Sequence, residues 1–356
     1  MSDAPGDKAP RVAVIVPAWN AAATIEPCLL AIARQTYAIA ECVLFDDGST
    51  DETAAIARRH GVRVIGHEGE PLGPALGRNR AAAAVDTDLL FFVDADVVLA
   101  PDALERLVEP FAAPQVTAAF GSYDASPPSL RASSQYVNLR HYFTHQTGER
   151  EAQTFWSGIG LVRRDAFLAL GGFDAELFTW PSIEDVELGA RILASGGRIR
   201  LVPEAQGAHW KDWRLKQFLH ADIFRRALPW SMLIADGKAA SNALNLSVAE
   251  RFKSVLAGCV VAALLVGIVE PWALPAALAL FGAYVVANRR FLRMVRRQAG
   301  AGTAAAAAIL HCFYHFYAAA VFVLVSAAMR FGLLRSRRKP PARPGGQLAP
   351  TRGHEP

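Results

Sequence analysis

The sequence predicts an α/β fold, in which a doubly wound, mostly parallel sheet is covered by helices and followed by apolar helices that are candidate transmembrane segments. Two observations carry this prediction. From residue 11 to about residue 100, short apolar runs alternate with segments of helical periodicity, as in repeated strand–helix–strand units. After residue 250 the chain becomes strongly apolar, and the 356 residues as a whole are 52% hydrophobic, which is high for a soluble protein.

The elements of the predicted sheet follow one another at short intervals. Apolar runs at residues 12–16, 42–45, 62–65 and 89–93 are predicted strands, and segments 21–35, 51–59 and 77–85 are the helices between them. Residues 123–150 are polar and weakly patterned, and we expect a helix there. Later strands are predicted near 155–162 and at 199–202, and later helices near 165–170 and at 183–194.

Three polar motifs come directly after predicted strands, at residues 17–20, 46–49 and 94–96. In open parallel sheets, ligands bind at the carboxyl ends of the strands. Because all three motifs are expected at that edge of the sheet, the sequence predicts a nucleotide site there.

Asp94 and Asp96 end the buried apolar run 89–93. Burying an unpaired carboxylate is costly, so a positive partner is expected beside them. A hard divalent cation, Mg²⁺ or Mn²⁺, meets this need when it is held by carboxylate oxygens and shared with a phosphate. A solvated strand end or a helix cap is the alternative when this motif is considered alone.

Residues 253–330 contain two or three predicted transmembrane segments. The apolar runs 255–269 and 273–287 are each shorter than the roughly 20 residues that a span needs, whereas run 304–329 is long enough. The positive-inside rule places the Arg-rich segment 289–297, expected as a loop, and the basic, disordered tail 331–356 in the cytoplasm. Three spans would put that tail outside, so a re-entrant or interfacial third run is the alternative.

Residues 213–235 are predicted to form an amphipathic helix. Leu215, Phe218 and Leu219 share one side of it, and basic residues lie elsewhere. This pattern, directly before the apolar runs, favours an interfacial helix that lies on lipid headgroups. An ordinary surface helix of the globular domain is the alternative.

Charge is distributed unevenly along the chain. Residues 1–288 hold 25 basic and 32 acidic residues, whereas residues 289–356 hold twelve basic residues and one acid, Glu355. A basic segment beside apolar runs suits anionic lipid better than nucleic acid, and no nucleic-acid partner is expected. Residues 1–10 are expected to be disordered and to stay in the cytoplasm, because no apolar signal segment is present. The four cysteines lack a C-x-x-C spacing and are expected to be reduced thiols.

Six short motifs occur in order within residues 11–212, at 14–20, 45–51, 77–79, 94–96, 171–174 and 184–185. In this order and spacing they resemble the catalytic domain of the family 2 glycosyltransferases of the Rossmann-like GT-A fold. The resemblance implies that a nucleotide-sugar donor lies against Pro17, Ala18 and Asn20. It also implies that Asp46 or Asp47 accepts a hydrogen bond from the base or the ribose. A turn that caps the next helix is the alternative for residues 46–49.

The same resemblance assigns a metal site on the donor. Asp94, Ala95 and Asp96 form the family's D-x-D motif, in which Asp96 is the more direct ligand. His209 is a candidate third ligand, with an ordinary loop histidine as the alternative. Mg²⁺ or Mn²⁺ bound there bridges the two phosphates and stabilises the leaving diphosphate. Arg78 resembles the basic residue on the phosphate or nucleotide side.

On the acceptor side, the resemblance implies that Asp185 deprotonates an acceptor hydroxyl and that the anomeric carbon is inverted. Glu184 would orient the reacting groups beside it. The amino terminus of the helix is expected to keep Asp185 ionised. The spacing from Ser182 to Asp185 is also a capping-box signature, so a purely structural role is the alternative.

Trp156 and Trp180 flank this segment and offer aromatic faces to a sugar, with simple core packing as the alternative. Processive members of the family carry Q-x-x-R-W after the base, whereas residues 209–214 read His-Trp-Lys-Asp-Trp-Arg. We therefore expect transfer of a single sugar to a lipid or lipid-linked acceptor at the cytoplasmic face of the inner membrane.

Three other functions were weighed. A membrane-bound sugar-nucleotide-binding protein and a polysaccharide synthase subunit remain as alternatives. A sugar-nucleotide nucleotidyltransferase would need a Gly-rich basic loop after the first strand, and residues 17–20 do not provide one.

Overall fold

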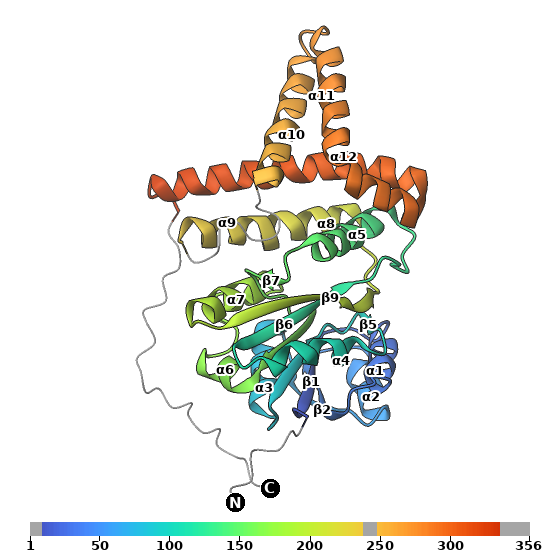
Figure 1. Ribbon diagram of the computed structural model, residues 1–356, viewed down its shortest axis with the longest axis vertical. Helices are drawn as coiled ribbons and strands as arrows, with labels where there is room; N and C mark the ends of the chain where they lie inside the picture. Colours follow the sequence, from blue (N-terminus) through green and yellow to red (C-terminus); the bar gives the residue numbers. More distant parts are fainter. Residues whose placement is uncertain (1–8, 238–247, 335–356) are drawn as a thin grey trace, which may run out of the picture.

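The computed structural model describes residues 9–237 and 248–334 (Figure 1). The predicted disordered ends, 1–10 and 331–356, lie almost wholly outside the described residues. In Figure 1 the α/β domain lies at the bottom, a layer of helices crosses above it, and a helical hairpin projects from the far side of that layer.

A mixed, mostly parallel sheet forms the centre of the α/β domain, as the sequence predicts. Its strands run in the order β3-β2-β1-β4-β8-β6-β9-β5, with β7 paired to β9. Strands β3, β2, β1 and β4 are mutually parallel, β6 is parallel to β9, and β8 runs antiparallel between β4 and β6. The strands are β1 Val12–Ala18, β2 Ile39–Asp47, β3 Arg63–His67, β4 Leu89–Val93, β5 Val97–Leu99, β6 Val116–Tyr123, β7 Glu151–Ala152, β8 Ile159–Arg163 and β9 Arg198–His209.

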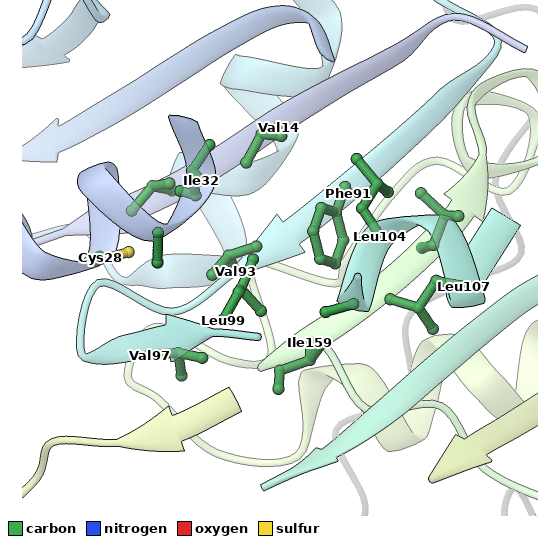
Figure 2. Close-up of a cluster of buried hydrophobic side chains, with 14 of the residues drawn as sticks. Val14, Cys28, Ile32, Phe91, Val93, Val97, Leu99, Leu104, Leu107 and Ile159 are labelled. Atoms are coloured by element: carbon green, nitrogen blue, oxygen red, sulfur yellow. The ribbon is translucent and has the colours of Figure 1, made fainter. Parts of the chain in front are cut away.

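Helices cover both faces of the sheet, which confirms the doubly wound class. They are α1 Ile25–Ala33, α2 Thr53–Arg59, α3 Pro74–Ala83, α4 Ala103–Val108 with a 3₁₀ turn Glu109–Ala112, α6 Arg164–Ala169 and α7 Glu184–Ala194. Strand β4 shows why both faces are needed: Phe91 packs on one side with α1 and α4, and Phe92 packs on the other with α3, α6 and α7. Figure 2 shows the first of these clusters, around Phe91 and Leu104.

Some strands differ from the sequence prediction. Strands β5 and β6 were not predicted, and β9 continues seven residues past the predicted end at residue 202, to His209. The inward positions of β9 beyond residue 202 are Pro203, Ala205, Gly207 and His209, so the alternation of large apolar residues stops there although the burial alternates. The helix expected within 123–150 is present as α5 Ala132–Thr147.

A layer of helices separates the sheet domain from the carboxyl-terminal hairpin (Figure 1). It contains α5, α8 Leu215–Asp222, a π-helical turn η2 Ile223–Ala227, α9 Leu228–Ala235 and α12 Arg289–Arg330. The predicted amphipathic helix 213–235 therefore forms, but its apolar Phe218 is buried against Tyr136 of α5 and Phe291 of α12. Leu215 and Phe224 stay exposed, and contact of this helix with headgroups remains a prediction.

The apolar part of the chain is arranged as a hairpin and one long helix. Helices α10 Val248–Val266 and α11 Ala273–Ala287 pair with each other and project beyond α12 (Figure 1). The Arg-rich segment 289–297, expected as a loop, is instead helical and continuous with α12, which has a kink at Gly300 with φ of 85°. Within residues 9–237 and 248–334, α12 is the helix that has the length and composition to cross a membrane, with a mean hydropathy of 1.9 in its most apolar window. The number of spans remains a prediction.

A buried ion pair fastens the helical layer together. Arg140 of α5 donates two hydrogen bonds to Asp222 of α8, at 2.7 and 3.1 Å, and Tyr317 of α12 donates a third to the same carboxylate. Burial alone would raise the pKa of Asp222, but attraction to Arg140 and Arg226 lowers it to about 2. The carboxylate is therefore ionised at neutral pH and joins three helices.

Replacing Asp222 by alanine is expected to reduce the free energy of unfolding by about 3–5 kcal/mol, because Arg140 would remain as a buried charge without its carboxylate. Thermal unfolding followed by circular dichroism measures the loss. Asp212→Ala is the matched control: it removes the partner of Arg131 in an exposed pair, and the melting temperature should hardly change. Equal melting temperatures of the two variants would contradict the assigned role of the buried pair.

Candidate active site

A cavity of about 630 Å³ opens at the carboxyl ends of β1 and β4 and collects most of the predicted site residues. Its lining includes thirteen of the fourteen: Pro17, Ala18, Asn20, Asp47, Arg78, Asp94, Ala95, Asp96, Trp156, Trp180, Glu184, Asp185 and His209. Asp46 is the exception. Residues that are far apart in the sequence are thus brought to one edge of the sheet, as expected for an open α/β fold.

Asp96 and His209 lie side by side in this cavity. Strand β5 pairs antiparallel with the end of β9, with Val97 opposite His209, and this places His209 Nε2 3.6 Å from Asp96 Oδ2. The imidazole is held flat against Tyr123, with ring centroids 4.2 Å apart. Burial would raise the pKa of Asp96, but the nearby His209 and Lys211 lower it to about 2.

Asp94 is turned toward a different partner. Arg78 donates from Nη2 to Asp94 Oδ1 at 2.7 Å and from Nη1 to Glu184 Oε1 at 2.9 Å. The Arg78 guanidinium is buried, and its terminal nitrogens are taken by these carboxylates. A direct contact of Arg78 with phosphate remains a prediction.

The pair of Asp96 and His209 suits a divalent cation. A carboxylate oxygen and an imidazole nitrogen are both donors that Mn²⁺ accepts, and Mg²⁺ accepts the carboxylate. The structure departs from the expected set of three ligands, because Asp94 Oδ1 is bonded to Arg78 and the described parts of the chain hold no group of three candidate ligand residues. Phosphate oxygens and water would have to complete the coordination.

Asp185 lies at the start of α7 and accepts hydrogen bonds from its surroundings. The backbone N–H of Ser157 donates to Oδ2 at 3.0 Å, and the N–H of Val186 donates to Oδ1 at 2.8 Å. Burial raises the pKa of Asp185, repulsion from Glu184 raises it further, and the hydrogen bonds and Arg78 only partly oppose this, so the pKa is about 6. Asp185 is therefore still ionised at neutral pH, as expected, although burial and Glu184 oppose the effect of the helix amino terminus.

The capping-box alternative for Asp185 does not describe this helix start. Ile183 is the N-cap, and the Ser182 hydroxyl donates to the carbonyl of Arg225 at 2.7 Å instead of bonding within α7. The Ser182 N–H donates to Glu184 Oε2 at 2.9 Å. Asp185 is thus available on the cavity side.

At the other end of the cavity, the segment 17–20 is fixed to the turn after β2. Asn20 has φ of 48°, and its Oδ1 accepts the N–H of Thr50 at 2.8 Å. Asp46 accepts the N–H of Ser49 at 3.1 Å, so the turn interpretation applies to this residue. Asp47 is buried and holds the loop before α3, accepting the N–H groups of residues 72 and 73 at 2.9 and 2.8 Å. A bond from either acid to base or ribose remains a prediction.

The part of the cavity around Trp156, Trp180 and Arg225 is aromatic and basic. Trp180 is 52% exposed, and the Arg225 guanidinium lies 5.7 Å from its ring centroid. Trp156 packs edge-on against Tyr123, with ring centroids 4.8 Å apart. Trp180 is therefore open to a ligand, whereas Trp156 is partly a packing residue.

Several lining residues were not singled out from the sequence: Trp19, Ser157, Lys211, Arg225 and Arg226. Trp19 lies within the motif 17–20 and could have been included. Arg225 and Arg226 belong to the π-helical turn, which has no recognisable sequence pattern.

Comparison with known proteins was made at the level of family, sequence and structure. Residues 13–171 match the family model described as glycosyl transferase family 2, and residues 138–212 match a model described as the N-terminal domain of galactosyltransferase. An N-acetylglucosaminyltransferase of Rhizobium leguminosarum bv. viciae is 29% identical over 216 residues, which are 56% of this chain and 51% of that enzyme. The matched region thus spans about half the length of that relative.

Two further proteins are similar over a larger share of their length. The O-antigen chain rhamnosyltransferase RfbN of Salmonella typhimurium is 25% identical over 240 residues, covering 62% of this chain and 74% of that protein. The structure of the mannosyltransferase PcManGT from Pyrobaculum calidifontis, in complex with GDP-Man and Mn²⁺, superposes with a TM-score of 0.56 at 25% identity and covers 89% of this chain and 88% of that one. Over residues 13–171 the chain is therefore similar to the family 2 glycosyltransferases, and its sheet domain has the GT-A fold.

Proposed function

We propose that the protein is a metal-assisted, inverting glycosyltransferase that moves a single sugar from a nucleotide-sugar donor to a lipid or lipid-linked acceptor. The observation that carries the proposal is that one cavity contains both the pair of Asp96 and His209 and the carboxylate of Asp185. A site for a donor diphosphate and a base for an acceptor hydroxyl are thus present together.

The donor lies at the β1 and β4 end of the cavity. Pro17, Ala18 and Asn20 border the nucleoside, and Asp96 and His209 would hold a divalent cation beside the diphosphate. That ion would supply Lewis-acid stabilisation of the charge that develops on the leaving diphosphate. The mannosyltransferase of similar structure contains Mn²⁺ together with its nucleotide-sugar, which supports this assignment.

Asp185 acts as the general base. Its carboxylate takes the proton of the acceptor hydroxyl, the acceptor oxygen bonds to the anomeric carbon, and the bond from that carbon to the donor phosphate breaks. Attack from the face opposite the leaving group inverts the anomeric carbon. A pKa of about 6 leaves Asp185 ionised at neutral pH while it remains basic enough to accept a proton. The N–H of Ser157 orients the carboxylate.

Association with the cytoplasmic face of the inner membrane is supported by the surface of the carboxyl-terminal helices. Large apolar side chains are exposed on α10, α11 and the connection between them: Val255, Leu264, Leu265, Val266, Ile268, Val269, Trp272, Leu274, Leu278 and Val286. The segment 289–297 packs on α5 through its apolar side chains and adds five exposed arginines. An apolar hairpin beside a basic helix suits a bilayer with anionic headgroups.

Asp185→Asn is expected to lower the rate of sugar transfer by about 10²–10⁴-fold, because no carboxylate remains to accept the hydroxyl proton. Transfer of radiolabelled sugar measures the rate, and calorimetry measures donor binding, which should be retained. Asp165→Asn, an exposed acid in the first turn of α6, is the matched control and should be fully active. Undiminished transfer by Asp185→Asn would remove this residue as the base, and a pure binding protein would show no transfer in any variant.

The rate of transfer is expected to fall about tenfold per pH unit below a pH of about 6, since protonation of Asp185 removes the base. The charged neighbours are Glu184, which raises this pKa, and Arg78, which lowers it, while His141 and Arg226 line the adjacent space. In Glu184→Gln the raising charge is gone, so the acid limb should move to lower pH. An acid limb that is unchanged in Glu184→Gln would speak against Asp185 as the titrating group.

Removal of divalent cations with EDTA is expected to abolish transfer, and added Mn²⁺ or Mg²⁺ should restore it. Asp96→Asn should reduce transfer by about 10³-fold at saturating metal, because the stabilisation of the leaving group is worth several kcal/mol. Asp102→Asn is the control for the loss of a carboxylate. Asp102 is half-exposed and lies outside the cavity, and it follows β5, the strand that Asp96 precedes. Full activity in EDTA would show that the site works without a metal.

A further inference from the structure

A second cavity, of about 600 Å³, lies between the sheet domain and the helical layer. Its walls come from α5, the start of α7, η2, α9, α10 and α12. In Figure 1, α5, α9 and α12 lie between the sheet and the hairpin, α7 lies beside the sheet, and α10 is one arm of the hairpin. The cavity thus extends from the catalytic side of the molecule toward its apolar end.

The second cavity is contiguous with the active-site cavity. His141, Trp156, Asp185 and Arg226 line both of them. The proposed base therefore stands at the junction, and a molecule that fills the second cavity has one end at the Asp185 carboxylate.

The wall formed by α12 is polar at Tyr314 and His315 and apolar beyond them, where it includes two small residues. His315, Ala318, Ala319, Phe322 and Val323 line the cavity, at spacings that place them on one face of the helix. The two alanines leave the space open. Val323 is 63% exposed and Phe322 is 40% exposed, so the cavity reaches the surface of the molecule beside the apolar part of α12.

Five ionic groups in the wall, Arg140, Asp222, Arg226, Glu250 and His315, are paired with one another. Arg140 is bonded to Asp222, and Glu250 lies 2.9 Å from His315 Nε2. Arg226 Nη1 lies 3.3 Å from Asp222 Oδ1, close to the junction with the active site. Because these charges satisfy each other, an apolar ligand can occupy the cavity without leaving them unpaired.

We propose that this second cavity binds the hydrocarbon chain of the acceptor, a single amphipathic lipid whose headgroup hydroxyl reaches Asp185. The inference rests on the proposed function and specifies the acceptor site. Burial of the chain against Ala318, Ala319 and Phe322 provides a favourable apolar contact. The headgroup lies beside Trp156 and Arg226, where the lining is polar and aromatic.

The test uses the full-length protein in nanodiscs of phosphatidylcholine and phosphatidylglycerol. The probe is a long-chain fatty alcohol with a diazirine in the middle of its chain. After irradiation, mass spectrometry locates the labelled residues. Labelling is expected on α9 and on the cavity face of α12. In Ala319→Trp, which fills the cavity, that labelling should fall about tenfold or more.

Val323→Trp narrows the exposed end and is the second variant, because an exposed position tolerates a large side chain without unfolding. Ala327→Trp is the matched control: it is on the same helix, exposed and outside the cavity, and its labelling pattern should equal that of the wild type. If Ala319→Trp does not fold, the comparison of Val323→Trp with Ala327→Trp decides. The proposal is overturned if the labelling is spread over the outer faces of α10 and α11 and is unchanged in both cavity variants. It is also overturned if the labelling is confined to a contact with a second copy of the chain.

Calorimetry of a nucleotide-sugar with Mn²⁺ on the same preparations keeps the two hypotheses separate. Both cavity variants should bind the donor as the wild type does. If the wild type binds no donor, the proposed function is contradicted. The labelling experiment needs no donor, so it still reports on the lipid site in that case.

Discussion

The arrangement of the active site depends on one buried ion triad, in which Arg78 joins Asp94 to Glu184. The two carboxylates come from the end of β4 and the start of α7, and Arg78 is 106 residues away from Glu184 in the sequence. The guanidinium compensates the negative charge of both acids in the cavity wall. A planar group with several donors can bond both at fixed separation, which the single ammonium of a lysine does less well. The triad therefore fixes the position of Asp94 relative to Glu184. In this way it sets the distance between the proposed diphosphate site and the proposed base.

The same triad also influences the pKa of Asp185, the proposed base. Glu184 is neutralised by Arg78, but it remains next to Asp185 and raises the pKa of that residue together with burial. Ser157 holds the Asp185 carboxylate from the opposite side. Local sequence reasoning considered only the helix terminus, which favours the charged form. The larger effect comes from tertiary burial, and no local pattern reports it.

The part of the site that sequence could predict is the part that local rules determine. Asp94 and Asp96 were placed correctly at the sheet edge because five apolar residues before them require a strand that is buried on both faces. The neighbourhood of His209 and Asp96 was expected only from the family resemblance, because no local rule indicates it. It depends on β9 running to residue 209, although Pro203 lies within it and its register with β6 shifts between Leu201 and Gln206. The last two residues of β9, Ala208 and His209, pair with the distant strand β5.

The Arg-rich segment 289–297 shows the opposite case. Its residues have helical spacing, but the positive-inside rule led to the expectation of a cytoplasmic loop, and the segment is a helix. The arginines of 289–297 recur at helical spacing, and Phe291, Leu292 and Val295 lie between them on one side. Those three side chains are buried against α5 and α8, so this amphipathic helix is held on the catalytic side of the molecule.

The placement of this helix has a consequence for the acceptor. Because the basic start of α12 packs on α5 and α8, the apolar residues further along α12 are carried across the helical layer to the second cavity. In the proposed function, the same helix attaches the domain to the membrane and forms the wall along which a lipid chain reaches Asp185. Membrane attachment and acceptor access are, by this geometry, two properties of one packed element.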